Sequence, residues 1–124
     1  MTAVRLVLPF PPRNLSPNVH AHWAVKAADA RSYRFTCKVL ALKARAKLAT
    51  YPLPSPVQAR IIFVGGNRTL PDTDNALASF KAGVDGLVDA KLITDDSPEH
   101  FQIVELLVRR GDKREVRVLL ESAR

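Results

Sequence analysis

The fold is decided by residues 57–64, Val-Gln-Ala-Arg-Ile-Ile-Phe-Val, and by the Gly65-Gly66 pair that follows them. β-Branched and aromatic side chains suit the pleated, buried surface of a sheet. Two successive glycines then end the apolar run. We therefore expect a buried strand over residues 57–64, and we place the other elements on either side of it.

Two elements are expected before this strand. Residues 25–49 are rich in Ala and free of Gly and Pro, and their small or apolar residues recur at the i, i+3, i+4 spacing of an amphipathic helix. The positions in that stripe are 30, 33, 37, 40, 41, 44 and 48. Further back, Val-Arg-Leu-Val-Leu at residues 4–8 predicts an opening strand, and a proline-rich loop of about a dozen residues follows it.

Three elements are expected after the strand. A second helix should begin at Asp74 or Asn75, either of which could be its N-cap, and end near Ala90. The apolar run at residues 103–108 and the alternation at residues 116–120 predict two closing strands, and their short connection predicts an antiparallel pair. The order β-α-β-α-β-β indicates an α+β fold, in which two main helices pack on a mixed sheet.

Length and composition limit the class of protein. A chain of 124 residues suits one domain, so we expect residues 1–124 to form a single unit. Cys37 is the one cysteine, which excludes an internal disulfide framework, and its place on the helical stripe predicts a core residue. No apolar run approaches the ~20 residues of a membrane span, and the start of the chain lacks a signal peptide, so we expect a cytoplasmic protein.

The charge of the chain is unevenly distributed. The net charge is +7 and the isoelectric point is about 10.1, values typical of a protein with a polyanionic partner or of a solubility bias. Residues 72–99 hold seven acids against two lysines, a local charge of −5, whereas the remaining residues hold 17 bases and five acids, a charge of +12. An acidic segment within a basic chain is therefore the feature to explain.

Two pairs of aspartates lie in this acidic segment. Asp72 and Asp74 are two residues apart, so in an extended chain their side chains would point to the same side. Two carboxylates about 4 Å apart repel by roughly 4 kcal/mol at an effective dielectric of 20. Such a pair persists if one carboxylate is protonated, if a basic side chain lies between them, or if a cation binds. Oxygen-only sites suit Mg²⁺. Of the neighbours Asp95 and Asp96, only one should join the first pair directly.

Lys81 completes a possible catalytic group. On a continuous helix, Lys81 and Asp85 would each lie about 20° from Asp74, where the lysine could neutralise charge developing at a phosphoryl group. Each of these residues could instead have a purely structural role. Lys81 could form an i, i+4 pair with Asp85, Asp72 and Asp74 could be turn and cap residues, and the Asp95-Asp96 pair could form a turn.

Four basic residues lie beside the apolar stripe of the first helix, within about 60° of one another. They are Arg31, Arg34, Lys38 and Arg45. They are our candidates for contacts to a DNA backbone, and the alternative is a solvated helix face. Arg5, Arg13, Lys26, Arg109 and Arg110 are further candidates without a ranking.

The H-x-H spacing of His20 and His22 could suggest metal ligation. Mg²⁺ prefers oxygen ligands, so DNA contact or no function fits these loop histidines better. The His22-Trp23 pair is expected to stack or pack at the rim of the site, or against the core.

A series of short motifs runs from about residue 6 to residue 100. They are Leu8-Pro9-Phe10-Pro11-Pro12, Leu15-Ser16-Pro17-Asn18, His22-Trp23, Asp72-Thr73-Asp74-Asn75, Lys81, Asp85-Gly86-Leu87-Val88 and Asp95-Asp96. In this order and spacing the sequence resembles the RusA-type endodeoxyribonucleases, bacterial and phage enzymes that resolve Holliday junctions. Five residues separate Asn75 from Lys81, a longer spacing than in the cellular prototype and similar to that of phage-borne members.

The resemblance implies a function and a site. The essential carboxylates would be Asp72, Asp74 and Asp96, with Asp95 as a less certain member and Lys81 as the catalytic-site lysine. The implied reaction is Mg²⁺-dependent hydrolysis of DNA phosphodiesters, with paired symmetrical nicks in a four-way junction. A junction has two symmetry-related strands, so the resemblance also implies a homodimer.

Two other functions fit the sequence. A flap or general branched-DNA nuclease would use the same metal site on a wider range of substrates. A non-catalytic basic module would bind DNA or RNA by charge alone, which explains the net charge but needs no cluster of acids.

Overall fold

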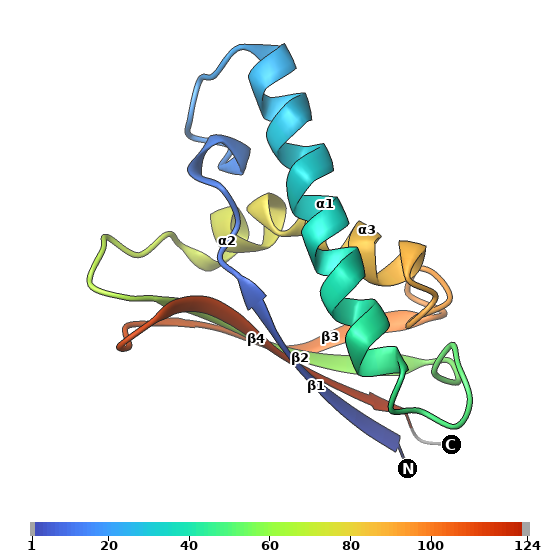
Figure 1. The fold of residues 1–124 in the computed structure, drawn as a ribbon. Coiled ribbons are helices and arrows are strands. Elements are labelled where there is room, and N and C mark those ends of the chain that lie inside the picture. The colour runs from blue at the N-terminus through green and yellow to red at the C-terminus, as the bar shows by residue number, and fades with distance from the viewer. Residues whose placement is uncertain (1, 123–124) are drawn as a thin grey trace.

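The computed structural model describes residues 2–122, and it has two layers, a mixed sheet and a layer of helices (Figure 1). The strands are β1 (Thr2–Pro9), β2 (Val57–Gly65), β3 (Phe101–Arg109) and β4 (Arg114–Ser122). The helices are α1 (Trp23–Arg45), α2 (Thr73–Ser79) and α3 (Lys81–Asp89), with a short 3-10 turn, η1 (Arg13–Leu15), before α1. The predicted α+β class with a mixed sheet is confirmed. Within residues 2–122, no helix is long and apolar enough to cross a membrane.

β2 is an inner strand of the sheet, as its composition predicts. It pairs in parallel with β3 on one side and antiparallel with β4 on the other. Ile61 and Phe63 are completely buried against the helices. The opposite face of the sheet carries exposed side chains such as Arg5, Arg60 and Leu107, and in Figure 1 all the helices lie on the other side.

The two closing strands are not paired with each other, so that prediction is wrong. The strand order is β1-β4-β2-β3, and β4 lies between β1 and β2. The short connection between β3 and β4 passes over the end of β2, where an added Cβ on Gly111 would lie 2.6 Å from Cγ1 of Val64. A glycine there lets the chain cross a strand end that a larger residue would obstruct.

α1 begins and ends close to the predicted bounds, and its stripe faces the core. Tyr33, Cys37 and Ala41 are buried, and Leu40 and Leu48 pack against the same cluster. Burial raises the pKa of Cys37 to about 11, which keeps the thiol protonated. The prediction that Cys37 is a core residue is confirmed.

The predicted second helix is two helices, and its N-cap is Asp72 rather than Asp74 or Asn75. The break falls at Phe80, which ends α2 and begins α3. The Phe80 ring is completely buried and makes edge contacts with Phe63 and Tyr33, at centroid distances of 5.5 and 6.3 Å. The interruption between α2 and α3 therefore coincides with the burial of a large aromatic ring in the core.

Gly86 allows α3 to lie directly against α1. A Cβ at this position would lie 2.6 Å from the carbonyl oxygen of Arg34 and 2.9 Å from the amide nitrogen of Lys38. Both of these atoms belong to the α1 backbone, which cannot rotate aside as a side chain can. Backbone contact between α1 and α3 therefore requires glycine at position 86.

Gly86→Ala should destabilise the protein by about 2 kcal/mol, because overpacking a close contact costs roughly 1–3 kcal/mol. In an unconstrained helix the same change stabilises by about 1 kcal/mol. The sign of the change in the free energy of unfolding, measured by urea titration, therefore tests the contact. A Gly86→Ala variant as stable as the parent would contradict it.

Candidate functional site

Asp72 has a structural role at the start of α2. Its Oδ1 accepts a hydrogen bond of 2.8 Å from the backbone N–H of Asn75, and its Oδ2 lies 3.4 Å from Nδ2 of the same residue. This is the N-cap arrangement, in which a carboxylate satisfies an amide that the helix leaves free. The cap alternative for Asp72 is therefore confirmed, and the carboxylate remains solvent-exposed.

Asp74 lies in the first turn of α2 and points away from Asp72. The chain is already helical at Thr73, so the premise of an extended segment is not met. At 100° per residue, positions 72 and 74 differ by about 200° around the helix axis. Within residues 2–122 the exposed Asp74 carboxylate has no hydrogen-bond or ion-pair partner.

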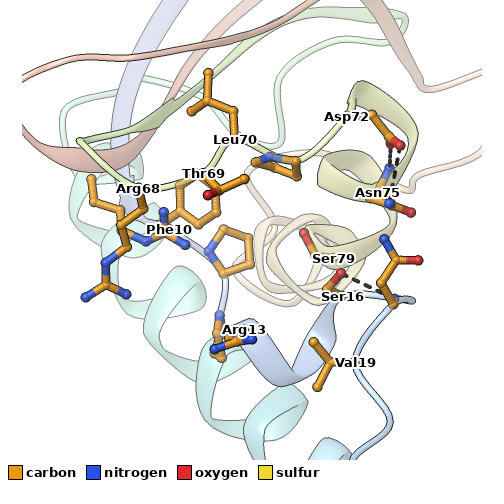
Figure 2. Close-up of a pocket in the computed structure, with 15 residues that line it drawn as sticks. Phe10, Arg13, Ser16, Val19, Arg68, Thr69, Leu70, Asp72, Asn75 and Ser79 are labelled. Carbon is orange, nitrogen blue, oxygen red and sulfur yellow. Dashed lines mark hydrogen bonds between the residues drawn. The ribbon is translucent and has the colours of Figure 1, made fainter.

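The Asp72 side of α2 borders a cavity of about 730 Å³ (Figure 2). Asp72, Asn75 and Ser79 line it from the start and body of α2, and the loops after β1 and β2 and the first residue of β4 supply the rest of its wall. Three arginines share this cavity, namely Arg13, Arg68 and Arg114. In Figure 2, Arg68 lies on one side of the cavity and Asp72 on the other. Of these arginines, Arg13 is among the DNA contacts expected from the sequence, whereas Arg68 and Arg114 are not.

The other side of α2 borders a hollow of about 400 Å³. Leu77 and Ala78, one turn after Asp74 on the same side of the helix, line it together with Lys81 and Asp96. Asp74 therefore lies near one end of a hollow that contains two of the other predicted site residues.

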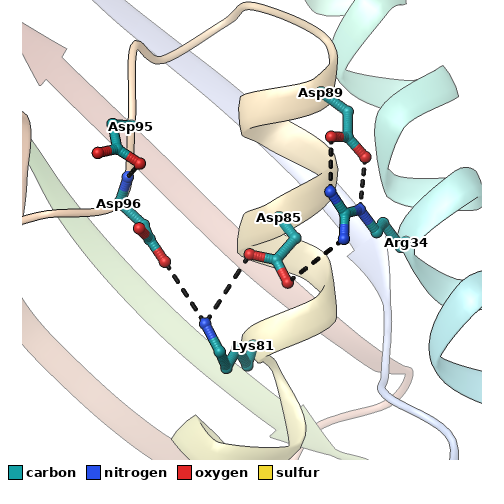
Figure 3. Close-up of polar contacts among 6 residues, drawn as sticks. All are labelled: Arg34, Lys81, Asp85, Asp89, Asp95 and Asp96. Carbon is teal, nitrogen blue, oxygen red and sulfur yellow. Dashed lines mark hydrogen bonds and ion pairs between the residues drawn. The ribbon is translucent and has the colours of Figure 1, made fainter. Parts of the chain in front are cut away.

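Lys81 joins two carboxylates at this hollow (Figure 3). Its Nζ lies 3.5 Å from Oδ2 of Asp96 and 3.9 Å from Oδ1 of Asp85, so the i, i+4 pair is confirmed. The Lys81 side chain is 72% exposed and that of Asp96 is 41% exposed. Both charged groups can therefore be reached by a ligand from solvent.

Asp95 and Asp96 point in different directions, as expected for neighbours. Oδ1 of Asp95 accepts a hydrogen bond of 2.8 Å from the backbone N–H of Asp96, and this bond lowers the pKa of Asp95. Asp95 thus supports the turn, whereas Asp96 faces Lys81.

The predicted carboxylates do not form one compact metal site within residues 2–122. No group of three or more His, Cys, Asp or Glu side chains in this part of the chain could hold a metal ion together. The donor chemistry suits Mg²⁺, because Asp72, Asp74 and Asp96 are exposed oxygen donors and this ion commonly binds one or two carboxylates, water and phosphate. The structure brings Asp96 to Lys81 but separates Asp72 from Asp74 around α2.

The basic stripe of α1 faces the acids of α3. Arg34 donates to both carboxylate oxygens of Asp89, at 2.6 and 2.8 Å, and lies 3.9 Å from Asp85. The paired Arg34 lowers the pKa of Asp89, and Lys38 adds a smaller effect in the same direction. Nη1 of Arg45 donates to the carbonyl oxygen of Ala90.

These contacts join α1 to α3, and they give the guanidinium groups of Arg34 and Arg45 partners within the protein. Arg31, on the same helix, is exposed, and within residues 2–122 it has no ion-pair partner. DNA binding by the stripe remains a prediction, and Arg31 is its most available member.

The His22-Trp23 pair lies at the start of α1. Nδ1 of His22 accepts a hydrogen bond from the backbone N–H of Ala24, so His22 is the N-cap of α1. Trp23 is 76% exposed, with its ring 5.5 Å from the His22 ring. Packing of Trp23 against the core, one of the two alternatives, is therefore wrong.

The fold and site define a two-layer α+β protein with exposed carboxylates around α2 and a group of arginines beside them. No family model matches the chain. Over 106 residues the chain is 37% identical to an uncharacterized protein of Xylella fastidiosa strain Temecula1, a match that spans 86% of this chain and 69% of that protein. The chain belongs to the same family as that protein.

Asp72→Ala should lower the free energy of unfolding by about 1 kcal/mol, because it removes the N-cap of α2. Asp72→Asn keeps an oxygen acceptor and should retain most of the stability. Asp74→Ala, which removes no hydrogen bond, should change stability by less than about 0.5 kcal/mol. Equal losses for Asp72→Ala and Asp74→Ala in urea titrations would contradict the assigned cap.

The Arg34–Asp89 pair predicts an acid-dependent contribution to stability. Because Arg34 lowers the pKa of Asp89 in the folded state, this contribution is present above the unfolded pKa near 4 and is lost as the pH falls below it. A surface pair of this kind contributes at most about 1 kcal/mol. Asp89→Asn should therefore be less stable than the parent at pH 7 and nearly equal to it at pH 2–3. A constant difference across this range, measured by thermal unfolding, would refute the assignment.

Proposed function

We propose that this protein is a Mg²⁺-dependent endodeoxyribonuclease of the RusA type, which cuts four-way DNA junctions by paired nicks. The observation that carries the proposal is the arrangement around α2. Exposed carboxylates and Lys81 lie on one side of this helix, and a cavity lined by three arginines lies on the other. The order and spacing of the motifs, from the proline-rich loop to Asp95-Asp96, support the same function.

The proposed roles follow from the chemistry of each side chain. Asp74 and Asp96 would hold the metal beside the hollow, whereas Asp72 lies on the cavity side of α2 and would contribute its exposed carboxylate there. Bound Mg²⁺ supplies Lewis-acid activation of water and neutralises phosphate charge. Lys81 would stabilise the negative charge that develops on the phosphoryl group, since its ammonium is exposed and already positioned between acids.

The distribution of charge supports a nucleic-acid substrate. The acids of residues 72–99 repel phosphate until a cation binds, whereas the basic remainder of the chain attracts it. Neutralised phosphates release counterions, so the affinity for DNA should fall steeply with salt.

A homodimer is part of the proposal, because two nicks in symmetry-related strands need two active sites. β4 is an inner strand, so of the two closing strands only β3 has a free edge. Edge pairing of two copies through β3 is compatible with the fold, whereas pairing through β4 is not.

A non-catalytic DNA-binding module is the second candidate. The observation in its favour is that residues 2–122 contain no group of three metal-binding side chains. Such a module would bind DNA through its arginines and would leave the strands intact. A branched-DNA nuclease with broader specificity would use the same residues and differ only in its substrates.

The test is a cleavage assay on a four-way junction, a flap and a linear duplex, with Mg²⁺ or EDTA. We expect symmetrical nicks in the junction with Mg²⁺ alone. Asp74→Asn and Asp96→Asn should reduce the rate at least about 100-fold while binding persists, because they remove proposed metal ligands. Glu105→Gln, which removes one acid from the open face of the sheet, is the matched control and should cleave normally.

Other outcomes favour the other candidates. Binding without cleavage by the parent protein in Mg²⁺ would support the non-catalytic module. Equal cleavage of flap and junction would support the broader nuclease. Normal cleavage by Asp74→Asn would show that the assigned site is wrong.

A further inference from the structure

The cavity beside Asp72 has a strongly basic part. Arg13, Arg68 and Arg114 line it, and none of the three takes part in an ion pair within residues 2–122. By contrast, Arg34, Arg60 and Arg117 each pair with a carboxylate. The arginines of this cavity are therefore available for an external anion.

Arg114 is held in place within the cavity by neutral groups. Its Nη1 donates to the carbonyl oxygen of Gly65 at 3.2 Å, and its guanidinium carbon lies 3.9 Å from the centroid of the Phe10 ring. These contacts orient the guanidinium without neutralising it.

Arg114 and Arg68 are close enough to repel each other. Burial lowers the pKa of Arg114, and the positive charge of Arg68 lowers it further. The carbonyl of Arg68 also accepts a hydrogen bond of 3.1 Å from Nη1 of Arg110, which brings another cation to this loop. An anion between these side chains would relieve the repulsion through charge-assisted hydrogen bonds.

Part of the remaining wall of the cavity is apolar, beside polar groups such as Ser16, Asn18 and Thr69. Phe10, Leu70 and Val19 contribute to it together with the neighbouring prolines (Figure 2). A volume of about 730 Å³ is within the usual range of small-molecule sites, about 300–1,000 Å³. The cavity thus combines anion-binding groups with an apolar surface in a space large enough for a nucleotide.

We propose that this cavity binds one nucleotide unit of a DNA strand, with the phosphate on Arg68, Arg114 and Arg13 and the base or sugar against the apolar wall. This inference rests on the proposed function, because the strand bound in the cavity would be the strand that the carboxylates act on. Asp72 lies across the cavity from Arg68, so the cavity would position the strand relative to the acids around α2. Arg68 and Arg114 are thus positioning residues for the substrate.

The test measures binding of a fluorescent four-way junction by anisotropy in EDTA, so that no cleavage or metal is involved. Arg68→Gln is the main variant, because the Arg68 side chain makes no hydrogen bond or ion pair within residues 2–122 and its loss should not disturb folding. Arg117→Gln removes the same charge from the open face of the sheet, at a residue outside the candidate DNA contacts, and is the matched control. Thermal unfolding checks that both variants are folded.

Arg68→Gln should weaken binding about tenfold, as expected for the loss of a charge-assisted hydrogen bond to phosphate. It should also reduce the slope of log K against log salt by about 0.9. Arg117→Gln should change the affinity and the salt slope by less than half as much as Arg68→Gln does. Equal effects of the two variants would overturn the proposal.

Competition with a deoxyribonucleoside 5′-monophosphate separates a strand from a free nucleotide as the occupant. The proposal predicts that millimolar nucleotide displaces the junction from the parent protein. It also predicts that the same nucleotide displaces less junction from the double variant Arg68→Gln/Arg114→Gln. Arg68-dependent binding of the free nucleotide, together with Arg68-independent binding of the junction, would overturn it.

Failure of this proposal is distinguishable from failure of the proposed function. If the protein cleaves nothing but binds DNA in an Arg68-dependent way, the cavity proposal stands and the proposed nuclease function is wrong. If the double variant Arg68→Gln/Arg114→Gln cleaves and binds at normal levels, the nuclease function stands and the cavity proposal is wrong.

Discussion

The contact between the backbones of α1 and α3 at Gly86 brings the acids of α3 to the basic stripe of α1. Since no Cβ separates the helices, Arg34 of α1 reaches Asp85 and Asp89 of α3. Asp85 and Asp89 therefore face α1, while Lys81 stays exposed at the start of α3 and contacts Asp85 from the other side.

The individual elements of the fold could be predicted from local patterns, whereas their pairing and one helix break could not. The strand at residues 57–64 and the helix over α1 were correctly located because burial imposes a period of 2 or 3.6 on their sequences. The position of β4 between β1 and β2 depends on contacts between segments far apart in the chain, which no local pattern records. Phe80 fits an unbroken apolar stripe, so only its place between Phe63 and Tyr33 accounts for the break.

The candidate site illustrates how one residue can satisfy both a structural and a functional interpretation. Asp72 is a helix cap and Lys81 forms an i, i+4 pair, yet both remain exposed to solvent beside a cavity or hollow. The geometric argument for Asp72 and Asp74 depended on an extended chain, and the early start of α2 removes it. Arg68 and Arg114 went unrecognised because they come from separate segments, and only the meeting of β2 and β4 brings them together.

α2 separates two electrostatic environments that a nucleic-acid strand would need together. A phosphate close to unpaired carboxylates is repelled, and a phosphate held only by arginines is bound but not activated. The helix has its polar residues Asp72, Asn75 and Ser79 on the side of the arginines and Asp74 on the side of Lys81 and Asp96. A strand crossing its N-terminal end would therefore be attracted on one side and would meet the acids on the other. Under the proposed function, this arrangement gives a physical reason for an acidic segment within a basic chain, because DNA affinity and phosphodiester hydrolysis would require opposite charges close to each other.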